Sequence, residues 1–274
     1  MSSFLGRKRI VVLTILLGAA FGFRLFVALR LPNDTPDDGR VYAQIARNVL
    51  EQHVYSHEEQ PPFTPSLIRL PGYPFFLAAI YAIAGHGNNT AVRVVQAILD
   101  TFMCVLVAFV AFQWTANPAR KRRAAYAAFG LAAVCPFTTI YVATILTEVP
   151  TSLLAVLLCL LTTLALKSTN NRRSFLFWIL AGLVAGLAVF FRPDSGLFAA
   201  AVGLTILIAA LTRKQFVRRF SKGVLSAAVF SIAFCLVLIP WTIRNRRVFG
   251  VFQPLSPAQK HCASFSPRST ERVV

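Results

Sequence analysis

Glu148 is the acidic residue with the most unusual position in the sequence. It lies between two long apolar runs, in the segment Thr147-Glu148-Val149-Pro150, and has no basic neighbour in sequence. An ionisable group at the boundary of an apolar run is costly unless it is solvated or paired, and such a residue commonly belongs to a functional site. A solvated turn that starts the next helix is the alternative, which Thr147 and Pro150 would also support. The sequence leaves both readings open.

Other ionisable residues offer weaker indications of chemistry. His53 and His57 have the i, i+4 spacing of two metal ligands on one helix face, but no further His or Cys lies near them, so we expect solvated loop residues. Arg192 and Asp194 flank Pro193 and either serve a site or only end two helices. No glycine-rich phosphate loop is present, which argues against a nucleotide site. We expect no cofactor; a divalent metal is possible but unsupported.

These side chains belong to a chain whose composition is typical of a membrane protein. Of its 274 residues 56% are hydrophobic, only 14% are charged, and the mean hydropathy is +0.63. Soluble domains carry about 25% charged residues. The hydrophobicity excludes disorder, and five cysteines, four of them inside apolar runs, exclude a disulfide-rich secreted module. We predict an all-α, polytopic transmembrane bundle.

About seven apolar runs have the length needed to cross roughly 30 Å of hydrocarbon. They are residues 10–31, 91–114, 124–146, 150–166, 175–191, 195–211 and 224–241. An eighth run, 73–84, is bracketed by Pro71-Gly72 and by Gly85-His86-Gly87 and would reach only about 18 Å as a helix. We interpret it as an interfacial or re-entrant helix, with a true span as the alternative.

The basic residues indicate how the chain is oriented. With seven spans and a cytoplasmic N-terminus, four inner segments carry basic residues and no acids, as the positive-inside rule requires. They contain Arg7 to Arg9, Arg120 to Arg123, Lys167 with Arg172 and Arg173, and Arg213 to Lys222. The net charge of +18 is therefore an orientation signal and not a nucleic-acid footprint. We expect a multi-pass protein of the plasma or inner membrane.

The first outer loop, about 32–90, is long for a connection between spans. Within it, apolar residues at 42, 45, 46, 49 and 50 predict an amphipathic helix on the membrane surface. Asp37 or Asp38 would be its N-cap, and capping is an ordinary alternative to a chemical role.

Five segments in order resemble one family of membrane enzymes. They are DGRVYAQIARN at 38–48, RLPGYP at 69–74, TEVP at 147–150, GLVAG at 182–186 followed by Arg192-Pro193, and PWTIRNRRVFG at 240–250. To about residue 256 the chain resembles the GT-C superfamily of membrane glycosyltransferases. The similarity is to the family 39-like group of protein O-mannosyltransferases and lipid A aminoarabinose transferases.

The resemblance implies a polyprenyl-phosphate-sugar donor and a lipid, glycan or protein acceptor at the extracytoplasmic face. The family's essential acid in the first outer loop maps to Asp38, with Asp37 as an ambiguous neighbour. The second acidic position maps to Glu148. The carboxylate of Asp38 would accept the proton of an attacking hydroxyl. Glu148 would help to position the donor or acceptor, or bind a metal in the branches of the family that use one.

The resemblance also assigns substrate-binding residues. Arg244 and Arg246, at the outer end of the last span, are the candidates to stabilise the leaving phosphate, with Arg69 as a further candidate. Tyr42 and Arg192 belong to the same matching segments. For the arginines, anchoring to anionic lipid headgroups is the alternative.

Members of this family usually continue with further spans. We therefore expect a module over 1–256, a disordered or aberrant tail over 257–274, and a chain whose activity is open. Two alternatives remain: a catalytically silent fragment that binds lipid phosphate, and a lipid or solute transporter. A transporter would favour an internal repeat and broken helices, and no convincing repeat is present.

Overall fold

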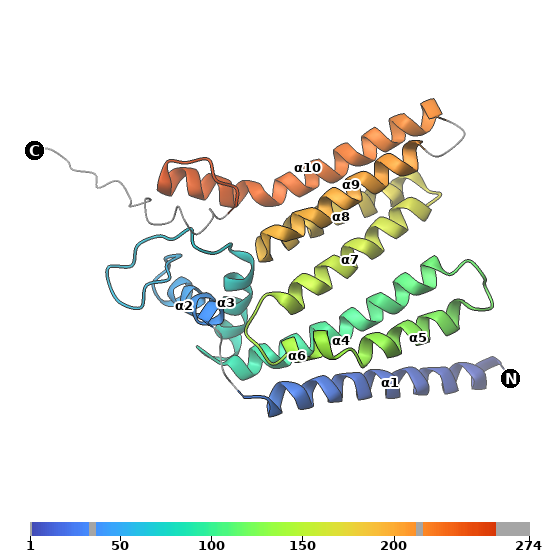
Figure 1. Cartoon of the computed structure of the whole chain (residues 1–274), viewed down its shortest axis with the longest axis horizontal. Helices are drawn as coiled ribbons and strands as arrows, with labels where there is room; N and C mark the ends of the chain where they lie inside the picture. Colours follow the sequence, from blue (N-terminus) through green and yellow to red (C-terminus); the bar gives the residue numbers. More distant parts are fainter. Residues whose placement is uncertain (1, 33–36, 212–215, 256–274) are drawn as a thin grey trace, which may run out of the picture. The chain divides into compact units, whose positions relative to one another are not determined.

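The computed structural model describes residues 2–32, 37–211 and 216–255. Within these ranges every regular element is helical, which confirms the predicted all-α class (Figure 1). The elements are α1 (Ser2–Arg30), α2 (Asp37–Glu51), α3 (Gly72–Ala84), α4 (Asn89–Trp114), α5 (Lys121–Ala133), α6 (Pro136–Tyr141), α7 (Glu148–Lys167), α8 (Asn171–Phe191), η1 (Pro193–Ser195), α9 (Gly196–Leu211) and α10 (Phe216–Phe249). The tail 257–274 and residues 213–214 lie outside the described residues.

Within the described residues, five helices are long and apolar enough to cross a membrane. They contain Val11–Arg30, Asn89–Trp114, Glu148–Lys167, Asn171–Phe191 and Lys222–Phe249. Each corresponds to one predicted span. Helices α3 and α9 are apolar but shorter, so the predicted number of about seven is approximate.

The predicted span 124–146 is not one helix. It divides into α5 and α6 because Pro136 has no N–H to bond the carbonyl of Ala132, and Cys135 before it adopts an extended conformation. An irregular segment, 142–147, then leads into α7.

Helix α10 continues beyond the predicted end at 241. Its 34 residues would measure about 51 Å, against roughly 30 Å of hydrocarbon, and Pro240 interrupts only its own hydrogen bond. Residues 242–249, predicted to follow the last span, therefore form further helical turns that carry Arg244 and Arg246.

The contacts divide the chain into two compact units. The first contains Met1–Gly39 and Asn88–Val156, and the second contains Arg40–Gly87 and Leu157–Val274. The boundaries predicted for a single module over 1–256 stay a prediction.

In the first unit, α1, α4 and α5 pack side by side around a buried ion pair (Figure 1). The side chain of Arg24 on α1 is completely buried, and its Nε donates to Oδ2 of Asp100 on α4 at 2.6 Å. Its terminal nitrogens donate to the carbonyls of Ala132 and Ala133 at 3.1 and 3.0 Å. Arg24 thus donates to two carbonyls at the end of α5, where the helix breaks before Pro136; the Ala132 carbonyl also accepts from the Cys135 amide at 3.3 Å.

In the second unit, α8 packs closely on α10 through two glycines one turn apart. A Cβ on Gly186 would lie 2.8 Å from Val237 Cβ, and one on Gly182 would clash with the Phe230 carbonyl. Both helices contribute to a buried apolar core, which includes Trp178 and Ala185 of α8 and Phe230 of α10. A second cluster joins α2 and the loop after it to α10 through Ile45, Tyr55, Leu70 and Trp241.

Candidate functional site

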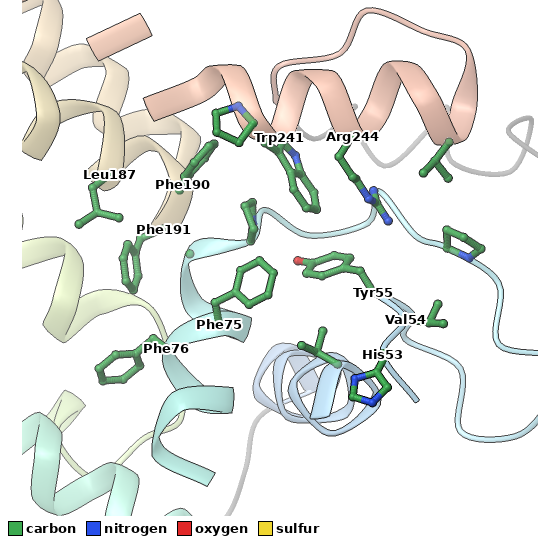
Figure 2. Close-up of a pocket in the computed structure, with 16 residues that line it drawn as sticks. His53, Val54, Tyr55, Phe75, Phe76, Leu187, Phe190, Phe191, Trp241 and Arg244 are labelled. Atoms are coloured by element: carbon green, nitrogen blue, oxygen red, sulfur yellow. The ribbon is translucent and has the colours of Figure 1, made fainter. Parts of the chain in front are cut away.

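A cavity of about 860 Å³ lies in the second unit, between the end of α2, the loop after it, α3, α8 and α10. Figure 2 shows its aromatic walls, which include Phe75 of α3, Phe190 of α8 and Trp241 of α10. Two ionisable nitrogen-bearing residues, Arg244 and His53, also line it. The cavity therefore combines a large apolar surface with few polar groups, as ligand pockets commonly do.

Arg244 is the cation held most closely by this cavity. Its guanidinium lies 4.7, 5.2 and 5.4 Å from the rings of Trp241, Phe249 and Tyr55. Nη1 donates to the Ser66 carbonyl at 3.1 Å and to Asn245 Oδ1 at 3.0 Å. Arg244 forms no ion pair with any carboxylate in the described part of the chain, so its charge remains available to an anion.

Tyr55 connects Arg244 to Arg69. Its side chain is only 8% exposed, its ring lies 4.9 Å from that of Trp241, and its hydroxyl donates to the Arg69 carbonyl at 3.0 Å. Burial raises the pKa of Tyr55, so the hydroxyl stays protonated as a donor. Sequence reasoning missed this residue; an aromatic side chain inside a polar loop was its only indication.

Tyr42 and Arg69 also come together. The Arg69 guanidinium lies 5.7 Å from the centre of the Tyr42 ring, which makes an edge contact with Tyr73 at 5.1 Å. Three predicted site residues, Tyr42, Arg69 and Arg244, are thus gathered around Tyr55.

The loop between α2 and α3 is folded by its own hydrogen bonds. The Asn48 amide donates to the carbonyls of Ser56 and Glu58 at 2.9 and 2.8 Å. The Glu58 carboxylate accepts from the Thr64 hydroxyl at 2.6 Å and from the Thr64 amide at 2.5 Å. These Thr64 bonds hold the pKa of Glu58 below its usual value. These bonds hold the loop in one conformation, in which it forms a wall of the cavity.

Gly72 allows α3 to approach α8. A Cβ at this position would lie 2.6 Å from the Phe190 carbonyl oxygen, closer than side chains tolerate. The glycine of the Pro71-Gly72 pair thus brings Phe75 and Phe76 beside Phe190 and Phe191 (Figure 2).

Asp37 and Asp38 lie in the first turn of α2, and both are exposed. The described part of the helix begins at Asp37, and residues 33–36 before it lie outside the described residues, so the capping role stays a prediction. Carboxylates in a first turn favour the positive end of the helix dipole.

Glu148 is the first residue of α7 and is half-buried, after the buried Thr147. The irregular segment before it is fixed by Gln96, whose amide donates to the carbonyls of Val142 and Thr144 at 3.2 and 2.7 Å. Helix α4 therefore holds the segment that leads into α7.

The two remaining predicted arginines lie at the ends of α8 and α10. Arg192 ends α8 and pairs with Asp194, with Nε to Oδ1 at 3.2 Å, and both side chains are exposed. Arg246 is exposed in the last turn of α10. The Arg192 pair fits the alternative reading, in which these residues end two helices.

Several helices that are long and apolar enough to cross a membrane define the class, an integral membrane protein, and its cavity has aromatic walls and a stacked guanidinium. The family model described as dolichyl-phosphate-mannose-protein mannosyltransferase matches residues 64–241, and the chain belongs to this family. It is therefore a membrane glycosyltransferase of the GT-C type. Among curated proteins, none matches the chain.

The matched region contains some of the candidate residues. Arg69, Glu148 and Arg192 lie within it. Asp37, Asp38, Tyr42, Arg244 and Arg246 lie outside it. Their assignment depends on the sequence resemblance and on the geometry given above.

Proposed function

We propose that the protein transfers a sugar from a polyprenyl-phosphate-linked donor to an acceptor hydroxyl on the extracytoplasmic face of the membrane. One observation supports this donor above others: Arg244 lies without a described carboxylate partner in an apolar cavity of about 860 Å³. A polyprenyl phosphate has the matching parts, an apolar chain and a charged head.

In this proposal the donor phosphate binds the Arg244 guanidinium, whose planar fork suits phosphate oxygens. The isoprenoid chain lies along Phe75, Phe190 and Trp241. Arg69 and Tyr42, across Tyr55 from Arg244, contact the sugar or its phosphate. Arg246 and Arg192 are assigned to charged headgroups near the opening.

The proposed reaction is a displacement at the anomeric carbon. The acceptor hydroxyl oxygen forms the new bond to that carbon, the bond to the phosphate oxygen breaks, and the phosphate leaves with the electron pair. Asp38 accepts the hydroxyl proton, with Asp37 as the alternative base, and Glu148 positions donor or acceptor. Arg244 stabilises the departing phosphate charge. The phosphate–sugar bond supplies the free energy of transfer.

The orientation in this proposal follows from the basic residues. Two basic segments between predicted spans contain no acidic residues, as cytoplasmic segments do. They are Arg120 to Arg123, and the segment with Lys167, Arg172 and Arg173. The N-terminus is then cytoplasmic and the loop after α1 is extracytoplasmic.

The test is sugar transfer by the full chain in proteoliposomes that contain polyprenyl-phosphate donors with radiolabelled hexose or pentose. We expect Asp38→Asn to lower transfer about 100-fold or more, as the loss of a general base does. Glu59→Gln, an exposed acid of the same loop, is the matched control. Equal transfer by Asp38→Asn and wild type would overturn the role of Asp38. Donor binding without any turnover would instead support a catalytically silent fragment.

A further inference from the structure

A second cavity lies in the first unit and shares no residue with the first. Its volume is about 520 Å³, and it is lined by α1, α4 and α5. Apolar side chains, including Leu13, Leu17, Phe109 and Phe129, form its walls. Among the described side chains that line it, Arg122 is the charged one. This volume is within the range of roughly 300–1,000 Å³ that ligand pockets occupy.

Basic side chains gather where this cavity meets the start of α5. Arg122 lines it, and Lys121 Nζ lies 5.3 Å from the centre of the Phe112 ring, which also lines it. Arg120 and Arg123 are exposed beside them. None of these four residues forms an ion pair with a carboxylate in the part of the chain that the structure describes. The cavity thus has apolar walls and a cationic opening.

Two helices of this unit, α1 and α4, contain candidate membrane spans by length and composition, so the apolar walls are suited to contact with lipid hydrocarbon. A basic pocket between transmembrane helices is suited to an anionic headgroup, while apolar walls accept a hydrocarbon chain. A phosphate monoanion would satisfy Lys121 and Arg122, whereas a zwitterionic headgroup would bring its own cation towards them. Charge complementarity therefore favours an anionic occupant.

We propose that this cavity binds an anionic phospholipid of the surrounding bilayer, with an acyl chain between α1, α4 and α5 and its phosphate between Lys121 and Arg122. The site is separate from the proposed donor site in its residues and in its ligand. Since Arg120 to Arg123 belong to a predicted cytoplasmic segment, the lipid is one of the inner leaflet.

Native mass spectrometry of the delipidated full chain tests this proposal. Phosphatidylglycerol and phosphatidylcholine with the same acyl chains are titrated separately. We expect tighter retention of phosphatidylglycerol, and a loss of about 25-fold in the Lys121→Gln/Arg122→Gln double variant, at roughly fivefold per basic residue. The control is Arg172→Gln/Arg173→Gln, which removes the same charge from the start of α8 and should leave retention unchanged.

A second variant tests the chain-binding part. Ala125 lines the cavity, and Ala125→Phe should fill it and lower retention of phosphatidylglycerol while the thermal unfolding midpoint stays within a few degrees. Several results would overturn the proposal: equal retention of both lipids, equal losses in the two charge variants, no loss in Ala125→Phe, or complete displacement by polyprenyl phosphate. A dimer that Ala125→Phe dissociates would place a second copy in the cavity and would overturn it as well.

Discussion

Arg244 is held by ring faces, a carbonyl and an amide oxygen, and not by a carboxylate. Hydrogen bonds and ring contacts fix the direction of the guanidinium without neutralising it. A guanidinium restrained in this way is prepared for an anion, because little side-chain freedom remains to be lost on binding.

Replacing Arg244 with lysine should therefore weaken binding of polyprenyl phosphate about tenfold, although the charge is kept. Lysine lacks the planar fork that stacks on Trp241 and binds phosphate through two nitrogens. The measurement is a binding titration with short-chain polyprenyl phosphate in detergent. Arg247→Lys, an exposed neighbour on the same helix, serves as the control; equal binding by both variants would remove Arg244 from the site.

Glu58 makes the shape of the loop sensitive to acid. Its pKa is lowered by the bonds from Thr64, so these bonds stabilise the loop above the ordinary carboxyl pKa and are lost as pH falls through the lowered value. We expect the protection factor of the Thr64 amide, which compares its exchange rate with that of an unprotected amide at the same pH, to fall as Glu58 becomes protonated in acid. Glu58→Gln should show low protection already at neutral pH, and Glu59→Gln should not. A protection factor that stays constant as Glu58 is protonated would contradict this account.

At the residue scale, the sequence predicted those site residues that lie inside a recognisable motif. The motifs assigned Tyr42, Arg69 and Arg244 to substrate binding. The structure brings these three residues around Tyr55. Tyr55 belongs to no motif, and its importance arises from tertiary packing that no spacing rule describes. The catalytic roles of Asp38 and Glu148 stay predictions.

At the element scale, the buried Arg24–Asp100 pair is linked to the helix break at Pro136. Hydropathy placed one span over 124–146 because apolar residues continue through the break, and a window average does not register a single missing N–H. The structure shows that Arg24 supplies donors at this break, to Ala132 and Ala133.

Removing Arg24 alone should be costly. Arg24→Met leaves Asp100 buried without its cation and should lower stability by about 3–5 kcal/mol, whereas Arg24→Met/Asp100→Leu should recover part of this loss. Thermal unfolding of the detergent-solubilised chain measures both. Arg30→Met, at the exposed end of the same helix, is the control. If the double variant were no more stable than the single one, the ion pair would not be the source of the loss.

The contact between α8 and α10 depends on glycine. Gly182→Val places a side chain against the Phe230 carbonyl, so the helices must separate, at a cost of about 1–3 kcal/mol or more. Thermal unfolding and donor binding should both weaken, because α8 and α10 also line the cavity. Gly203→Val on α9, where a Cβ meets no atom within 4 Å, should change little. Equal effects of the two substitutions would contradict close packing at Gly182.

At the scale of the whole molecule, composition and charge pattern predicted most of what is general. They predicted the all-α class and about seven spans, and the structure describes five helices long enough to cross a membrane. The resemblance of five sequence segments predicted a membrane glycosyltransferase, which the family match confirms in its general form. Hydropathy sums many small contributions and is therefore dependable over 20 residues. It does not predict where a helix breaks or how far α10 extends, because these depend on single bonds and on packing.

The central claim is that the aromatic cavity binds the lipid-phosphate donor. It is tested most directly by photolabelling the full chain in proteoliposomes with a polyprenyl phosphate that carries a diazirine near the phosphate. We predict adducts on peptides that contain Phe75, Phe190 and Trp241, which excess unlabelled polyprenyl phosphate prevents and Arg244→Gln reduces. Labelling confined to other parts of the chain, or labelling that the unlabelled lipid does not compete, would contradict the claim.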